Sequence, residues 1–221
     1  MIIPTIGDIK AGLFDMDGLL FNSETLYRGA LWKMAKDRGR EFTVLMHREM
    51  MGRSSSESMQ VVKDAWESLD SIESLIQERD LNVIEIARRE IEIMPGADAL
   101  VRFCMDRELS HAIVTGSNAK VAAAFVEISQ IGNGFQFILD GDQVENGKPA
   151  PDIYLKAAEM IGSHPENCLV FEDSLNGVKS AVAAGCHVIA CPNEFSLDQD
   201  FSIADRRVGS LSEIVSYLGM L

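Results

Sequence analysis

The stretch Ile9–Leu20, with the sequence IKAGLFDMDGLL, decides how the rest of the chain is interpreted. A short apolar run ends in Asp15, and Asp17 follows two positions later. An unbroken apolar run is typical of a strand that is buried on both faces of a parallel sheet. Burying carboxylates beside such a strand costs free energy unless a cation or a hydrogen-bond donor pairs with them. Gly18 accepts a positive φ, so the chain can turn directly after the acids. We therefore expect a buried strand whose tip carries two carboxylates that face one cleft, the alternative being a turn with solvated acids.

The residues from about 22 to 93 show helical periodicity and no strand pattern. Apolar residues recur at helical spacing from Tyr27 to Ala35 and predict a first helix that stops near Gly39. Ser54-x-x-Glu57 has the capping-box pattern and opens a further helix through Leu69. The helices expected here cover about 23–38, 44–51 with an end at Gly52-Arg53, 54–69 and 71–93.

From Met94-Pro95-Gly96 onward, helical and strand patterns alternate. The expected helices are 95–107, 118–129, 150–161, 174–184 and 210–218, and the expected strands are 110–114, 135–139, 168–171 and 187–190. This alternation predicts an α/β fold with a doubly wound parallel sheet. The helical block then becomes an insertion after the first strand. The predicted division is an α/β core of residues 1–21 and 94–221 and an all-helical domain of residues 22–93.

Composition excludes several classes of protein. The formal net charge of −14 over 221 residues argues against nucleic-acid binding, which rewards basic surfaces. For an anionic partner, the same charge requires a local cation and a metal ion rather than a basic face. No apolar run reaches the length of a membrane span, and residues 1–4 show no signal-peptide pattern. The four cysteines lack CxxC spacing, which favours buried free thiols in a reducing, cytoplasmic setting. The four histidines form no ligand motif, so a histidine metal site is not expected.

The second predicted core strand ends in Val114-Thr115-Gly116, directly before a helix. A hydroxyl, a glycine amide and a helix N-terminus together favour an anion site. Capping of the helix is the alternative use of these residues, and we assign it to Asn118, which leaves Thr115 and Gly116 as candidate phosphate-binding residues.

A single lysine, Lys148, lies in a stiff loop between Gly147 and Pro149. The proline restricts Lys148 to extended geometry, which directs the side chain. A lone loop lysine is usually solvated, but this one supplies the local cation that the acidic composition requires.

A further apolar run ends in Glu172-Asp173. These acids could cap the following helix. Alternatively, with Asp15 and the carbonyl oxygen of Asp17, they form a hard oxygen site suited to Mg²⁺. Four strand ends would then carry two acids, a hydroxyl, a lysine and two metal carboxylates, in that order.

These ordered motifs resemble the haloacid dehalogenase (HAD) superfamily, in its branch with a helical cap that contains β-phosphoglucomutase-like proteins and sugar-phosphate phosphatases. The resemblance covers most of the core and includes the segments around Asp15, Thr115, Lys148 and Asp173. It implies a Rossmann-like core and makes the helical insertion a cap. One departure is Asn22, where this branch more often has Asp, and it concerns contacts at the cap hinge.

The resemblance implies a Mg²⁺-dependent phosphatase of a small phosphorylated metabolite, with a sugar phosphate as the first choice. Asp15 would be the nucleophile that forms an aspartyl-phosphate. Asp17 would be the general acid and base. Thr115, Gly116 and Lys148 would hold the phosphate oxygens. The metal set would be Asp15, Asp17, Glu172 and Asp173.

The cap would select the substrate, and Arg53 at a helix junction is its candidate contact, although a solvated arginine is the plain alternative. Two other functions remain open at this point. A phosphomutase of the same branch shares the motifs, and a non-catalytic phospho-receiver module shares the strand-tip acids and the Lys-Pro pair. No nucleic acid, membrane or protein partner is expected.

Overall fold

The computed structural model describes residues 8–50, 53–131 and 134–220. The chain divides into two compact units. One consists of Met1–Asn22 with Glu92–Leu221 and is called the α/β unit here. The other is Ser23–Ile91, the helical unit. Among the described residues, no helix combines the length and the apolar composition that crossing a membrane demands.

The α/β unit is built on a parallel sheet, as predicted. Within the described residues its strand order is β3-β2-β1-β4-β5-β6, and every neighbouring pair is parallel. The strands are β1 (Ala11–Phe14), β2 (Ser110–Val114), β3 (Ile138–Leu139), β4 (Cys168–Glu172), β5 (His187–Ala190) and β6 (Arg206–Arg207). The order runs outward from β1 in both directions, which defines a topological switch point between β1 and β4.

Two edge strands differ from the sequence prediction. The strand expected over 135–139 is regular only over Ile138–Leu139, although the amide of Gln136 still donates to the carbonyl of His111 at 2.9 Å. Strand β6 was not predicted, because its two residues are exposed arginines that lack any apolar alternation.

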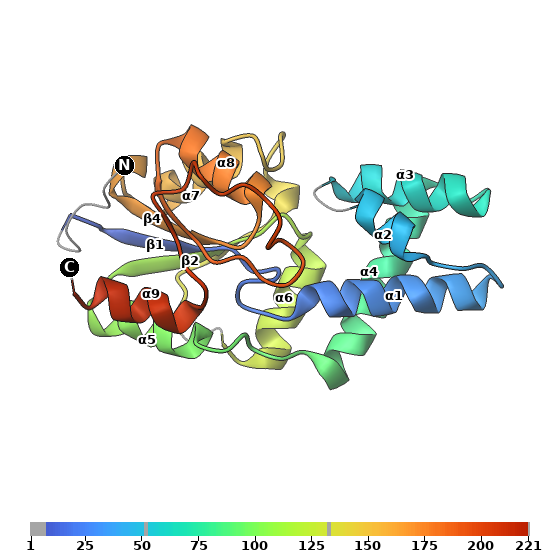
Figure 1. Cartoon of the computed structure of the whole chain (residues 1–221), viewed down its shortest axis with the longest axis horizontal. Helices are drawn as coiled ribbons and strands as arrows, with labels where there is room; N and C mark the ends of the chain where they lie inside the picture. Colours follow the sequence, from blue (N-terminus) through green and yellow to red (C-terminus); the bar gives the residue numbers. More distant parts are fainter. Residues whose placement is uncertain (1–7, 51–52, 132–133, 221) are drawn as a thin grey trace. The chain divides into compact units, whose positions relative to one another are not determined.

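Helices cover both faces of the sheet (Figure 1). Helices α7 (Asp152–Ile161) and α8 (Leu175–Ala184) lie on one face, and α5 (Ala97–Asp106) and α9 (Leu211–Leu218) lie on the other. The remaining elements are α6 (Ala119–Ser129) and the short 3₁₀ turns η1 (Gly141–Gln143) and η2 (Pro165–Asn167). Because both faces are covered, the central strands are apolar throughout, which explains the unbroken apolar run in β1. The four cysteines are buried free thiols, as predicted.

Capping side chains set the starts of several helices. Asn118, Ser174 and Ser210 each accept a hydrogen bond from a backbone N–H in the first turn of the helix that follows. The helices predicted to begin at these residues therefore begin one position later. Helix α5 begins at Ala97, with Gly96 at φ +93° as its cap, so the predicted start at Pro95 was two residues early.

The helical unit contains α1 (Ser23–Asp37), α2 (Val44–Met50), α3 (Ser55–Trp66) and α4 (Ile72–Glu90). The capping box of Ser54 and Glu57 is present. Helix α3 ends earlier than predicted, because Glu67 adopts a left-handed conformation with φ +51°. The predicted end of the second helix at Met51 and Gly52 lies outside the described residues.

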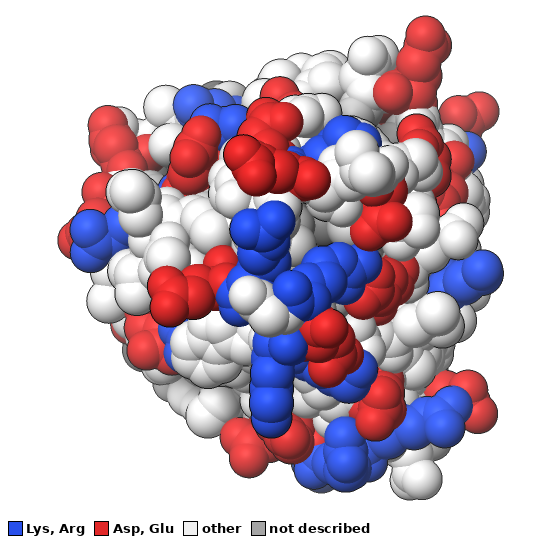
Figure 2. Space-filling view, turned by 90° about the vertical axis from the view of Figure 1, so that its right-hand side faces the viewer, with Lys and Arg blue, Asp and Glu red and all other residues white. Residues whose placement is uncertain are grey.

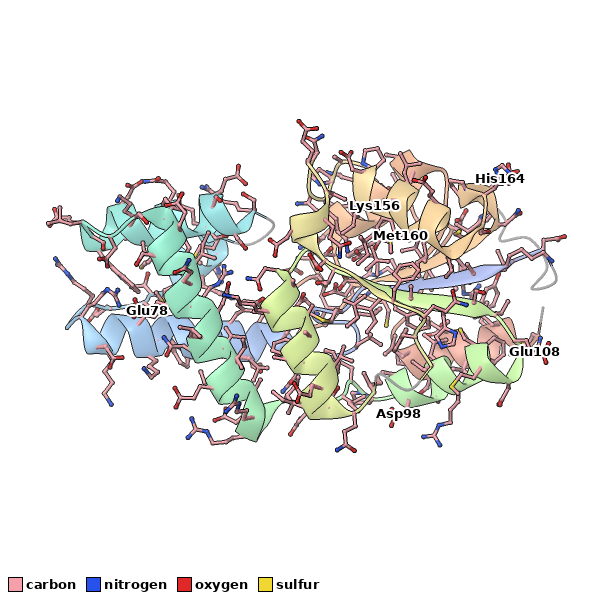
Figure 3. The ribbon with its side chains drawn as sticks, turned by 180° about the vertical axis from the view of Figure 1, so that it is seen from behind. Glu78, Asp98, Glu108, Lys156, Met160 and His164 are labelled. Atoms are coloured by element: carbon pink, nitrogen blue, oxygen red, sulfur yellow. The ribbon has the colours of Figure 1, made fainter. Side chains whose placement is uncertain are left out.

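Charged side chains cross-link the helical unit. The guanidinium of Arg38 donates to both carboxylate oxygens of Glu78, at 2.6 and 2.5 Å, and to Asp70 at 3.1 Å. Glu78 lies on α4 and is labelled in Figure 3. On the face drawn in Figure 2, Lys and Arg side chains gather near the centre with Asp and Glu side chains on several sides. This face therefore carries both signs of charge rather than one continuous basic surface.

Candidate active site

The strand order places the predicted site residues at the carboxyl ends of neighbouring strands. The sheet ladder continues one residue past two of these strands. The amide of Asp15 donates to the carbonyl of Phe171 at 3.0 Å, and the amide of Thr115 donates to the carbonyl of Leu139 at 2.9 Å. These bonds fix the backbone from which the functional side chains project. The tips of β2, β1 and β4 therefore meet beside the switch point, where open α/β sheets bind ligands.

Lys148 joins the tips of β1, β2 and β4. Its Nζ donates to Asp15 Oδ1 at 2.5 Å, to Glu172 Oε1 at 2.7 Å and to the carbonyl of Val114 at 3.2 Å. The side chain of Lys148 is nearly buried, and so are both carboxylates. Lys148 is therefore in the position of the single local cation that the acidic composition led us to expect.

Glu172 is held by more hydrogen bonds than the sequence suggests. Among the described residues, Oε1 accepts from Lys148 and from the hydroxyl of Tyr154 at 2.8 Å, and Oε2 accepts from the amide and hydroxyl of Ser174 at 3.1 and 3.0 Å. These four bonds occupy the strong acceptor positions of the carboxylate. Glu172 can therefore bind a metal ion directly only if it gives up one of them.

Gly177 on α8 lies against this carboxylate, because a Cβ at this position would come within 1.7 Å of Glu172 Oε1. We expect Gly177→Ala to destabilise the protein. The overlap should cost about 3 kcal/mol, since four hydrogen bonds hold the carboxylate in place. Better helix propensity returns only about 1 kcal/mol. Urea denaturation measures the difference in unfolding free energy.

Gly29→Ala on α1 is the matched control for Gly177→Ala. Its added Cβ would meet Ile86 Cδ1 at 3.4 Å, an ordinary contact. We expect the control to be neutral or stabilising by up to about 1 kcal/mol. Equal changes in unfolding free energy in the two variants would show that the Glu172 carboxylate can move away from the added Cβ without loss of stability.

Asp17 is held by two hydroxyl groups from the loop after β2. Thr115 Oγ1 and Ser117 Oγ each donate to Asp17 Oδ2 at 2.8 Å, and Thr115 Oγ1 accepts from the amide of Ser117 at 3.0 Å. The other oxygen, Oδ1, is buried and has no hydrogen-bond partner among the described residues. A buried oxygen in this condition is costly, which indicates a position for a ligand.

Asp173 lies on the other side of the β1 tip. Its Oδ2 accepts from Asn193 Nδ2 at 2.7 Å, and the same nitrogen donates to the carbonyl of Gly18 at 3.1 Å. Gly18 has φ +79°, and a Cβ there would come within 2.4 Å of Asp173 Oδ2. Glycine is thus required both for the turn after the acids and for the close approach of Asp173.

Negative charge exceeds positive charge at this site. Burial raises the pKa of Asp15, the Glu172 carboxylate raises it further, and the Lys148 charge only partly lowers it, so the pKa lies well above its ordinary value. Burial opposes the charge of Lys148, but Asp15 and Glu172 outweigh burial and hold the lysine pKa well above its usual range. One lysine therefore does not balance the carboxylates around it.

The residues present fit a divalent cation. Oxygens of Asp15, Glu172 and Asp173 lie within 4.8 Å of one another, and all three residues are buried. Hard carboxylate oxygens suit Mg²⁺. The side chain of Asp17 is not part of this group of three. The site is an acidic cluster that could bind a metal ion.

Gly116 follows Thr115 in the loop after β2, and Arg53 belongs to the helical unit. A Cβ on Gly116 would meet no described atom within 4 Å, and the binding of phosphate by the Gly116 amide stays a prediction. Arg53 is exposed in the helical unit and forms an ion pair with Glu49 at 3.4 Å. The substrate contact of Arg53 stays a prediction.

Sequence reasoning missed four supporting residues, Ser117, Tyr154, Ser174 and Asn193. The capping role beside Ser117 was assigned to Asn118, and Ser174 was predicted to be the first residue of a helix, whereas it caps α8. Tyr154 lies on the inner face of α7, where its apolar neighbours made it look like a core residue. Asn193 follows β5 in a loop without any motif. The proximity of a strand end was the signal that could have identified Asn193.

Known proteins resemble this chain in sequence and in fold. The family model of haloacid dehalogenase-like hydrolases matches residues 9–185. The phosphorylated carbohydrates phosphatase of Thermotoga maritima is 32% identical over 177 residues, which cover 80% of this chain and 82% of that protein. Protein CbbY of Rhodobacter capsulatus is 32% identical over 229 residues, covering 93% of this chain and 95% of that protein.

The fold also agrees with a solved structure. A mutant of CbbY from Rhodobacter sphaeroides in complex with xylulose-(1,5)bisphosphate has a TM-score of 0.86 at 25% identity, covering 93% of this chain and 96% of that chain. The predicted fold class and enzyme class, a phosphoric monoester hydrolase, are confirmed. The chain belongs to the haloacid dehalogenase-like hydrolases.

Proposed function

We propose that this protein is a Mg²⁺-dependent phosphatase that hydrolyses a small sugar phosphate through an aspartyl-phosphate intermediate. The observation that carries the proposal is the meeting of Asp15, Lys148 and Asp173 at the ends of neighbouring parallel strands. A carboxylate at a strand tip, one buried lysine and a second buried carboxylate are suited to phosphoryl transfer, in which catalysis consists of positioning and charge stabilisation.

Asp15, Asp173 and the backbone carbonyl of Asp17 would hold the ion, and Glu172 would contribute its charge and keep Lys148 in place. When bound, Mg²⁺ supplies positive charge that reduces the repulsion between an anionic nucleophile and an anionic phosphate. It would also offset the burial and the Glu172 charge that together raise the pKa of Asp15.

The side chains of the site divide the remaining work. Asp15 attacks phosphorus and displaces the sugar alkoxide, and water later cleaves the Asp15–phosphate bond. Lys148, Thr115 and the backbone amide of Gly116 hold phosphate oxygens, where negative charge spreads in the transition state. Asp17 gives a proton to the leaving alkoxide and takes one from the attacking water. Ser117 Oγ orients Asp17 for both transfers. Thr115 Oγ1 donates its single proton to Asp17 in this structure and would have to redirect it to hold a phosphate oxygen.

A sugar phosphate is supported as the substrate class by the relatives. One is named a phosphorylated carbohydrates phosphatase, and another was crystallised with a sugar bisphosphate. The helical unit is proposed to act as the cap that selects the sugar, with Arg53 as a candidate contact. It carries 11 Lys and Arg against 13 Asp and Glu, so it repels an anionic substrate less than the α/β unit does.

A panel of sugar phosphates assayed with Mg²⁺ tests the proposal. We expect release of inorganic phosphate that a chelator abolishes and added Mg²⁺ restores. Asp15→Asn from the same purification controls for contaminating phosphatases.

The panel also separates the alternatives. An isomerised sugar phosphate, seen by ³¹P NMR with a hexose 1-phosphate and its bisphosphate, would indicate a phosphomutase. Stoichiometric phosphate uptake without turnover would indicate a phospho-receiver module. Absence of Mg²⁺-dependent hydrolysis across the whole panel would overturn the phosphatase proposal.

A further inference from the structure

Asn193 links the loop after β5 to the ends of β1 and β4. It lies in the loop after β5, three residues beyond the last residue of the strand. Its Nδ2 donates to Asp173 Oδ2 at 2.7 Å, beyond the end of β4, and to the carbonyl of Gly18 at 3.1 Å, in the turn after β1. One amide group therefore joins a candidate metal ligand to the turn that carries Asp17.

The orientation of the Asn193 amide is fixed by its own loop. Its Oδ1 accepts from the amide of Phe195 at 2.8 Å, and its backbone N–H donates to Ser196 Oγ at 3.1 Å. The amide of Ser196 closes the turn onto the carbonyl of Asn193 at 3.0 Å. Because Oδ1 is used by Phe195, the nitrogen is the atom that faces Asp173.

The space around this contact leaves little freedom for Asp173. A Cβ on Gly18 would lie 2.5 Å from Asn193 Nδ2 and 2.4 Å from Asp173 Oδ2, so the turn, the amide and the carboxylate are tightly packed. Asp173 is buried, and it belongs to the group of three carboxylates whose oxygens lie within 4.8 Å of one another. A rotation of the Asp173 carboxylate would break this group.

We propose that Asn193 is a positioning residue for the ion site and acts by holding the Asp173 carboxylate in its ligating orientation. This inference rests on the proposed function, because it assumes that the acidic cluster binds Mg²⁺. Hydrogen-bond partners of ligating carboxylates tune metal affinity, and their loss typically weakens binding by about 10–100-fold. Asn193 forms no hydrogen bond with Lys148 or Asp15, so its loss should weaken the ion site without removing the chemistry.

The test is the Mg²⁺ affinity of Asn193→Ala and Asn193→Ser, measured by the Mg²⁺-dependent rise in unfolding temperature and by the Mg²⁺ concentration for half-maximal activity. Serine can still accept the bond from Phe195 but is too short to reach Asp173, so it preserves the turn if alanine does not. We expect both midpoints to rise about 10–100-fold. At saturating Mg²⁺, kcat should return to within about threefold of the original value, because P–O cleavage does not use Asn193.

Asn146→Ala is the matched control, because Asn146 Nδ2 also donates to an aspartate, Asp152 Oδ1, at 2.9 Å, outside the acidic cluster. Its Mg²⁺ midpoints should not change. Unchanged midpoints in both Asn193 variants would overturn the inference, and so would a loss of kcat that saturating Mg²⁺ does not restore. If the original protein itself shows no response to Mg²⁺ in either measurement, the proposed function fails instead.

Discussion

Asp15→Asn is expected to lower phosphate release by about 10⁴-fold or more, the scale on which loss of a covalent nucleophile acts in other hydrolases. The amide has the shape of the carboxylate but is a poor nucleophile, and no phosphorylated intermediate can accumulate on it. The measurement is single-turnover and steady-state phosphate release, together with the intact mass of the protein after mixing with substrate. A mass increase by one phosphate is expected in the original protein and not in the variant.

The same variant should keep or gain stability when no metal is present. Burial and the charge of Glu172 hold the pKa of Asp15 well above its ordinary value, so the ionised form is disfavoured in the folded state. A neutral amide removes that cost, and thermal unfolding in chelator should show an equal or higher Tm. Exposed Asp198→Asn is the control and should leave both activity and Tm unchanged. Full activity in Asp15→Asn would show that the nucleophile lies elsewhere.

The positions of the strand tips could be predicted from sequence because they depend on local patterns. An apolar run that breaks into acids at Asp15 and again at Glu172 marks the carboxyl end of a buried strand. Carboxyl ends of parallel strands meet at one edge of a sheet, so the convergence of these acids follows from fold class alone. Lys148 was predictable through charge, because an acidic chain with an anionic substrate needs a cation at the site.

Residues whose role depends on a distant neighbour could not be predicted. Tyr154 has the sequence context of a core residue on an amphipathic helix. Its hydroxyl donates to Glu172 only because the fold brings α7 beside the end of β4. Asn193 lies 20 residues from Asp173 in a loop that carries no motif. Several helix starts were shifted by one or two residues for a related reason, since a capping side chain looks like the first residue of its helix until backbone angles are known.

The α/β unit contains far fewer basic residues than acidic ones. It contains 9 Lys and Arg against 21 Asp and Glu, whereas the helical unit contains 11 and 13. The unit that would bind phosphate is therefore the one that repels anions most strongly. Lys148 and a bound ion would have to overcome this background locally, which makes the lysine the second residue whose loss should have a large effect.

Lys148→Met is expected to lower kcat/KM by about 10²–10³-fold, the scale of losing one preorganised charge at a transition state. Methionine keeps an unbranched stem but removes the donor to Asp15 and Glu172. Because the lysine charge lowers the pKa of Asp15, its removal raises that pKa further, and more of the nucleophile is protonated at neutral pH. The activity of the variant should therefore recover in part as pH rises, to a greater extent than that of the original protein.

Stability should change with pH in the opposite direction. A carboxyl group whose folded pKa lies above its unfolded pKa contributes stability while it is protonated, and that stability is lost as pH rises through the folded pKa. In chelator, the Tm of Lys148→Met should thus fall more steeply with rising pH than the Tm of the original protein. Lys156→Met on α7, where the lysine donates to the carbonyl of Gln143 at 2.7 Å, is the control (Figure 3). Parallel pH profiles of activity and Tm in Lys148→Met and the original protein would show that Lys148 does not set the ionisation of Asp15.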